Sequence, residues 1–87
     1  MSSMADAQVG KVTHYYDKIS VAVVELIGNL KVGDTIKVVG HGNEFTQEVG
    51  SMQIEHEKLE DAHKDQEIGL HVDQPVKEGD LVYKVSE

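Results

Sequence analysis

The sequence contains no cysteine, no tryptophan, no arginine and only one proline. Without cysteine, disulfides, thiolate nucleophiles and cysteine-ligated zinc sites are excluded. Without arginine, every basic residue is a lysine, which lacks the bidentate contact that arginine makes to phosphate. These absences remove thiol enzymes and cysteine-based zinc domains from consideration, and they weaken the case for nucleic-acid binding.

Long hydrophobic runs are also missing. The longest uncharged, mainly apolar stretch is Ile19 to Val24, far shorter than the roughly 20 residues that a membrane helix needs. Residues 1–8 are small and polar and lack the basic and apolar regions of a secretory signal. We expect a cytoplasmic protein without membrane association, with a disordered tail over residues 1–8 and a single domain over 9–87.

Charge of one sign dominates the chain. Acidic residues outnumber basic ones by 16 to 8, which gives a net charge of -8 with histidine neutral. Nucleic-acid affinity rests largely on basic side chains that displace counterions, so this charge disfavours direct nucleic-acid binding. A protein partner is the better expectation.

Apolar and polar residues alternate at the two-residue period of β-strands through most of the chain. Hydrophobic residues make up 39% and aromatic residues 5% of the sequence, so the core must be aliphatic and rich in β-branched valine, which favours strands. The pattern predicts an all-β domain of about six short strands. They are expected at Val9–Tyr16, Ile19–Ile27, Thr35–Val39, Phe45–Glu57 with a bend at Gly50, Glu67–Val72 and Leu81–Val85.

The alternation also predicts which side chains face the core. Val12, His14 and Tyr16 share one side of the first strand, and Leu81, Tyr83 and Val85 are expected inside in the last. The second strand has two apolar rows, one with Ile19, Val21 and Val23 and the other with Ala22, Val24 and Leu26. Residues 59–66 have good helix formers but one large apolar residue, which predicts a loop with one helical turn at most.

A short repeat links two turns of the predicted fold. Residues 31–36 and 77–82 share the form Lys-x-Gly-Asp-x-aliphatic, in which a glycine turn is followed by a strand. The nucleotide-binding loop is absent, since Asp34 stands where its lysine is needed, and neither Ser51 nor Ser86 lies in a Gly-x-Ser-x-Gly elbow. No catalytic residue is predicted, and the chain is expected not to be an enzyme.

Histidines and acids gather in the second half of the chain. Segment 55–67 holds six acidic residues and two lysines, which is typical of a solvated loop or of an acidic rim for a basic protein surface. One alternative function is a metal- or small-ligand-binding protein that uses segment 55–71, which requires His56, His63 and His71 to converge. His14 and His41 complete the set of histidines. A second alternative is a structural or oligomerising subunit that pairs through exposed strand edges, and the chain is expected to be a monomer or weak oligomer.

Three segments carry a resemblance to a known family. Residues 28–40, Gly-Asn-Leu-Lys-Val-Gly-Asp-Thr-Ile-Lys-Val-Val-Gly, resemble the turn and third strand of the second domain of translational GTPases such as elongation factor Tu. Residues 52–54 with 68–70, and then residues 76–82, are similar to later elements of that domain in the same order. Similar barrels occur as accessory C-terminal domains of collagenase-like peptidases and related RNA-modifying proteins.

The resemblance implies a six-stranded Greek-key β-barrel of the elongation-factor domain 2 type, without catalytic residues or cofactor. It implies a binding module that acts through protein contacts in translation or RNA modification. In elongation factor Tu, an acid and an arginine three residues later help to hold the aminoacyl end of tRNA; the matching positions here are Gln53 and His56, which differ from both. Gln53, Glu55, His56 and Glu57 are therefore the candidate binding residues.

Overall fold

The computed structural model describes residues 6–40, 42 and 44–85, which form ten β-strands and no helix. The strands are β1 (Asp6–Tyr16), β2 (Val21–Leu26), β3 (Leu30–Lys31), β4 (Thr35–Val39), β5 (Glu44–Glu48), β6 (Met52–Ile54), β7 (Glu57–Leu59), β8 (Asp61–Ala62), β9 (Glu67–His71) and β10 (Leu81–Val85). The all-β class is confirmed. The first strand begins earlier than predicted, at Asp6, and the rest of the expected tail, residues 1–5, lies outside the described residues.

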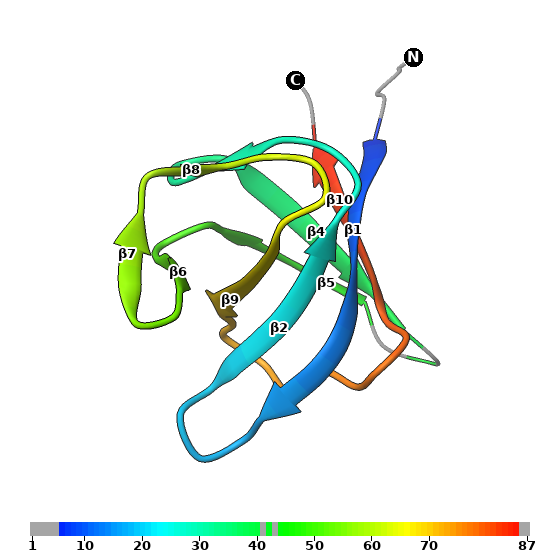
Figure 1. The fold of residues 1–87 in the computed structure, drawn as a ribbon. Coiled ribbons are helices and arrows are strands. Elements are labelled where there is room, and N and C mark those ends of the chain that lie inside the picture. The colour runs from blue at the N-terminus through cyan, green and yellow to red at the C-terminus, as the bar shows by residue number, and fades with distance from the viewer. Residues whose placement is uncertain (1–5, 41, 43, 86–87) are drawn as a thin grey trace.

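Eight strands form one antiparallel sheet in the order β5-β4-β10-β1-β2-β9-β6-β7, and β3 pairs with β8. Figure 1 shows the large sheet curling round on itself. Within the described residues the ladder of pairings stays open between its two ends, so the predicted closed, six-stranded Greek-key barrel is wrong in that respect. β1 and β10 lie side by side, with Asp6 opposite Val85.

One segment of chain serves both ends of the curled sheet. The predicted strand Phe45–Glu57 is interrupted at residues 49–51, next to the expected bend at Gly50. Its first half, β5, pairs with β4, and its second half, β6, pairs with β9. The interruption lets a single stretch of sequence change neighbours, which brings the two ends of the sheet close along the chain.

The core inside the curl is aliphatic, as predicted. β2 buries Ala22, Val24 and Leu26, and β4 buries Ile36 and Val38. Each apolar side chain that is fully buried away from water contributes roughly 1.5–3 kcal/mol to the stability of the fold through the hydrophobic effect. The remaining buried apolar residues are Val9, Val12, Leu30, Val49, Met52, Ala62, Ile68, Leu70, Val72, Val76 and Val82.

In two strands, the prediction of which side chains face the core is wrong. In β10 the buried residue is Val82, because it lies opposite the inward-facing Val38 of β4, and its neighbours in β10 are only half buried. In β1 the pairing with β2 shifts register between Val12 and His14, so a bulge turns the residues beyond Val12 over. As a result Val12 is buried while His14 and Tyr16 are exposed on the outer face.

Segment 59–66 has no helical turn in the structure. It contains the end of β7 and all of β8, which pairs with β3. The N–H of Val32 also donates to the carbonyl of Glu60, at 2.9 Å. Pairing with residues 30–32 therefore holds residues 60–62 extended against their local helix propensity. Residues 63–66 form a turn, in which the Gln66 N–H donates to the His63 carbonyl at 3.2 Å.

The two Lys-x-Gly-Asp segments form the same turn. Asp34 accepts a hydrogen bond from the Lys31 N–H at 3.0 Å through its carboxylate, and its own N–H donates to the Lys31 carbonyl at 3.1 Å. Asp80 makes the matching bonds with Lys77, at 2.9 and 3.1 Å. The glycine before each aspartate has a positive φ, 98° at Gly33 and 94° at Gly79, as the third position of a type II turn requires.

We predict that Gly79→Ala lowers the free energy of unfolding by about 1–2 kcal/mol, because alanine resists a positive φ. A Cβ at Gly79 meets no atom within 4 Å, so the loss comes from the backbone alone. Gly79→Asn should lose less, since asparagine tolerates this region better. Urea unfolding of the two variants measures the difference, and equal losses would contradict the explanation.

Gln47 of β5 is a buried polar residue that joins two parts of the fold. Its side-chain amide donates to the carbonyl of His71 at 3.0 Å and accepts from the N–H of Asp73 at 2.7 Å. The side chain thus satisfies backbone groups just beyond β9 that strand pairing leaves open. It connects the β5 end of the sheet to the segment after β9.

Gln47→Leu should lower the free energy of unfolding by about 1–3 kcal/mol, because both backbone groups lose a partner. Glu48→Gln, an exposed change one residue away, is the control and should have little effect. The midpoint of urea unfolding reports both. A Gln47→Leu variant as stable as the control would show that water replaces the lost bonds.

The outer strands of the sheet carry charge. Glu44 and Glu48 are exposed on β5, and Glu57 and Lys58 on β7. Charged residues on short edge strands oppose pairing with another chain. Over the described ranges, no helix has the length and apolarity to span a membrane.

Candidate functional site

An open groove of about 420 Å³ lies on the outer face of the sheet, where β1, β2, β9 and β6 are neighbours. In Figure 1, β9 lies between β2 and β6, with the β1–β2 and β6–β7 hairpins on either side. The groove is lined by Tyr16, Ile19, Val21, Val23, Gln53, Ile54, Glu55, His56, Glu67, Ile68 and Gly69.

Gly69, in the middle of β9, forms the floor of the groove. It lies opposite Val23 of β2 on one side and Gln53 of β6 on the other. A Cβ at this position would lie 3.3 Å from the Gln53 Cγ and 3.3 Å from the Val21 Cγ1. The missing side chain therefore lets Gln53 and Val21 approach each other over β9, and both residues line the groove.

One wall of the groove is apolar and exposed. Tyr16 at the end of β1 is 50% exposed, and Ile19 in the following turn is 61% exposed. The bulge in β1 places Tyr16 on this face, and the outer row of β2 continues the wall with Val21 and Val23. Large apolar side chains this exposed mark a surface suited to contact with another molecule.

The other wall is the turn between β6 and β7. Ile54 pairs with Glu57, which leaves Glu55 and His56 as a two-residue loop. Both have positive φ, 50° and 70°, the combination found in type I′ turns. Such turns favour Asn-Gly, so a glutamate and a histidine here carry backbone strain of about 1–3 kcal/mol each.

Three of the four candidate binding residues, Gln53, Glu55 and His56, thus line one groove. Glu57 is exposed on β7, outside the lining. Sequence reasoning did not find Tyr16 or Gly69. Tyr16 was missed because its place on this face depends on a bulge in β1. Gly69 did carry a signal, since a glycine between Ile68 and Leu70 inside a strand can indicate that another group approaches the backbone closely.

The histidines do not assemble a metal site within the described residues, where no group of three potential ligands comes together. The convergence of His56, His63 and His71 that the metal hypothesis needs is therefore not found. His14, His63 and His71 instead lie near one carboxylate each: Glu78 at 3.3 Å, Asp61 at 3.6 Å and Asp73 at 4.0 Å. His41 lies outside the described residues.

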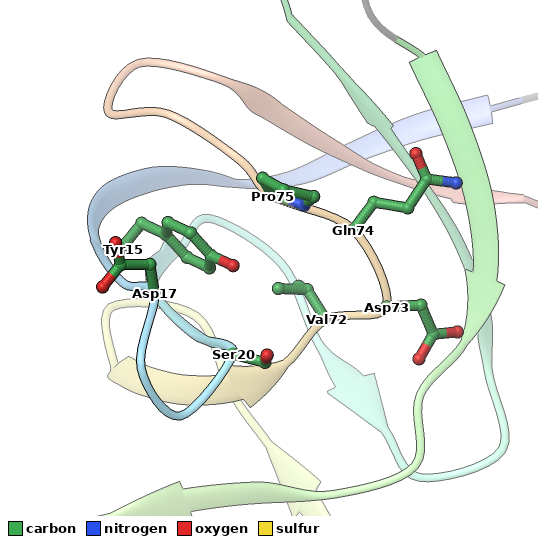
Figure 2. A pocket seen from close by; sticks show the side chains of 7 residues that line it. All are labelled: Tyr15, Asp17, Ser20, Val72, Asp73, Gln74 and Pro75. Atoms are coloured by element: carbon green, nitrogen blue, oxygen red, sulfur yellow. The ribbon is translucent and has the colours of Figure 1, made fainter.

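A second hollow, of about 580 Å³, lies between the β1–β2 turn and the segment after β9. Figure 2 shows that the polar side chains around it diverge: Asp73 and Gln74 point away from Tyr15 and Ser20. Polar groups that converge on one point are what a specific ligand site needs. This hollow is therefore the weaker candidate.

The curled sheet and its outer groove define a small all-β domain. The model of the peptidase family U32 C-terminal domain matches residues 7–82, and the chain belongs to this family. An uncharacterized protease of Methanocaldococcus jannaschii is 42% identical over 81 residues, which cover 92% of this chain and 20% of that protein. The chain thus spans about a fifth of the length of this relative.

Solved structures agree on the fold. Two crystal structures of the C-terminal domain of a Geobacillus thermoleovorans protein assigned to the U32 peptidases match with TM-scores of 0.82 each. They are 23% and 24% identical and cover 86% and 87% of this chain, and the matches cover 95% and 89% of those chains. The resemblance to accessory domains of collagenase-like peptidases is confirmed, whereas a translational GTPase domain finds no support in these comparisons.

Replacing the strained turn should stabilise the domain. Glu55→Asn/His56→Gly supplies the residues that a type I′ turn favours and should raise the free energy of unfolding by about 1 kcal/mol. The matched control, Glu57→Asn/Lys58→Gly, introduces the same residues in β7, where φ is not positive, and should destabilise. Thermal unfolding compares the two. A destabilised turn variant would contradict the assignment of strain to Glu55 and His56.

Proposed function

We propose that this domain is a non-catalytic accessory module that acts through contact with a larger protein of the U32 peptidase family. The observation that carries the proposal is that the chain corresponds to only a fifth of the M. jannaschii relative. The other four fifths of such a protein provide ample room for a reaction centre. The domain then contributes a surface for recognition.

The arrangement of side chains supports a role in binding. Catalysis by a serine nucleophile needs a base within hydrogen-bond reach. Among the described residues, no side-chain hydrogen bond joins a serine hydroxyl to a histidine ring. The groove between the two hairpins is the feature of this fold best suited to contact.

The charge of the chain supports a protein partner over a nucleic acid. A net charge of -8 steers the domain toward a basic surface and away from phosphate. The sequence suggests a setting in translation or RNA modification. Only the resemblance to RNA-modifying proteins with similar accessory barrels connects this setting to the proposal. A translational partner has no support in the comparisons.

Affinity capture on the immobilised domain, followed by mass spectrometry, tests the proposal. A protein of the U32 family should be enriched on the wild type relative to a charge-matched unrelated domain. Gln53→Ala/His56→Ala should capture at least about tenfold less if the groove is the contact, a loss of about 1.4 kcal/mol. Absence of any U32-family chain from the wild-type capture would reject the proposed function. Equal capture by both forms would keep the function and move the contact elsewhere.

A further inference from the structure

Gly69 has no backbone reason to be glycine. Its φ lies outside the left-handed region that favours this residue, and it is paired on both sides in the interior of the sheet. A Cβ here would lie 3.3 Å from the Gln53 Cγ and from the Val21 Cγ1, so glycine lets these two side chains approach each other over β9. The apolar groove beside them is open to an occupant from outside.

The walls around this floor fit an aliphatic side chain. Val21 and Val23 line the groove on β2, and Tyr16 and Ile19 line it with half or more of their surface exposed. Ile54 also lines the groove while it packs partly against the core. A volume of about 420 Å³ lies in the lower part of the roughly 300–1,000 Å³ range of ligand pockets. The groove suits one or two side chains of an extended segment.

The charges at the rim are acidic. Glu55 and Glu67 both line the groove, and no lysine is among the lining residues. Glu67 is held at its end of the groove by a hydrogen bond from the Thr13 hydroxyl, at 3.1 Å. The strained turn holds Glu55 at the other wall. Charge complementarity therefore favours a basic occupant.

These features disfavour other occupants on electrostatic grounds. A second copy of this chain carries the same charge of -8 and is repelled. Single-stranded nucleic acid needs basic residues along its backbone, which the groove lining lacks. A basic, partly apolar polypeptide remains.

We propose that the groove binds an extended segment of the partner chain, with a branched aliphatic side chain over Gly69 and a lysine or arginine beside Glu55 or Glu67. This inference rests on the proposed function, because it names the chemistry of the contact with the larger U32-family protein. In the M. jannaschii relative, four fifths of the chain lie outside the matched segment and are covalently linked to it. Tethering raises the effective concentration of such a segment, so modest intrinsic affinity is sufficient.

Labelled model peptides test the chemistry directly. The probe is Ser-Lys-Val-Lys-Ile-Lys-Ser, with Ser-Glu-Val-Glu-Ile-Glu-Ser as the charge control, Ser-Lys-Ser-Lys-Ser-Lys-Ser as the apolar control and a single-stranded oligoadenylate as the nucleic-acid arm. Fluorescence anisotropy measures affinity, and amide chemical shifts in NMR locate the contact. The basic, aliphatic peptide should bind at least about tenfold more tightly than either peptide control. Its shifts should centre on Val23, Gly69 and Gln53.

Charge reversal supplies the matched variants. Glu55→Lys/Glu67→Lys should reverse the preference in favour of the acidic peptide, and both positions are exposed, so the fold should survive. Glu48→Lys/Glu60→Lys makes the same change in net charge at exposed positions outside the groove and should keep the wild-type preference. Equal affinity for basic and acidic peptides, an unchanged preference in the first variant, or groove shifts caused by the oligoadenylate alone would overturn the inference. If the peptides fail while the domain still captures a U32-family protein, the occupant is wrong and the proposed function stands.

Discussion

The fold depends on one constraint, which is that a single stretch of chain must belong to both ends of a strongly curled sheet. Residues 49–51 interrupt that stretch, so that β5 pairs with β4 while β6 pairs with β9. Gln47 reinforces the arrangement through its bonds to the backbone at His71 and Asp73. The curl then encloses a core of valine, isoleucine and leucine, and its outer face carries the groove over β2, β9 and β6.

Local sequence rules predicted much of this fold. Thr35–Val39 is a strand with Ile36 and Val38 inside, as alternation requires, and the Lys-x-Gly-Asp repeat forms equivalent turns because glycine and aspartate act through bonds within four residues. The predictions that failed concern features that depend on residues distant in sequence. The facing of β10 is set by Val38 across the sheet, the extended conformation of residues 60–62 is set by pairing with residues 30–32, and closure of the sheet is set by which strand lies at each end.

The candidate site likewise has one part that the sequence predicted and one part that it did not. Gln53, Glu55 and His56 were suggested by resemblance, and the structure places them on one wall of a groove. The opposite wall was not predicted, because Tyr16 reaches it only through a bulge between Val12 and His14 that the sequence does not announce. The sequence also did not predict the backbone strain at Glu55 and His56, because the two-residue loop follows from the pairing of Ile54 with Glu57. Backbone strain of this kind is found in proteins mainly at sites that contact ligands, in accord with the proposed contact.

The pairing of Asp6 with Val85 has a consequence for how this domain is connected to other chains. Both ends of the described chain leave the fold at one place, at the start of β1, whereas Tyr16 lies at the far end of the same strand. At about 3.3 Å per residue, an eleven-residue strand separates the two places by roughly 30 Å. A linker attached at the paired ends would thus lie a full strand length away from the Tyr16 side of the groove.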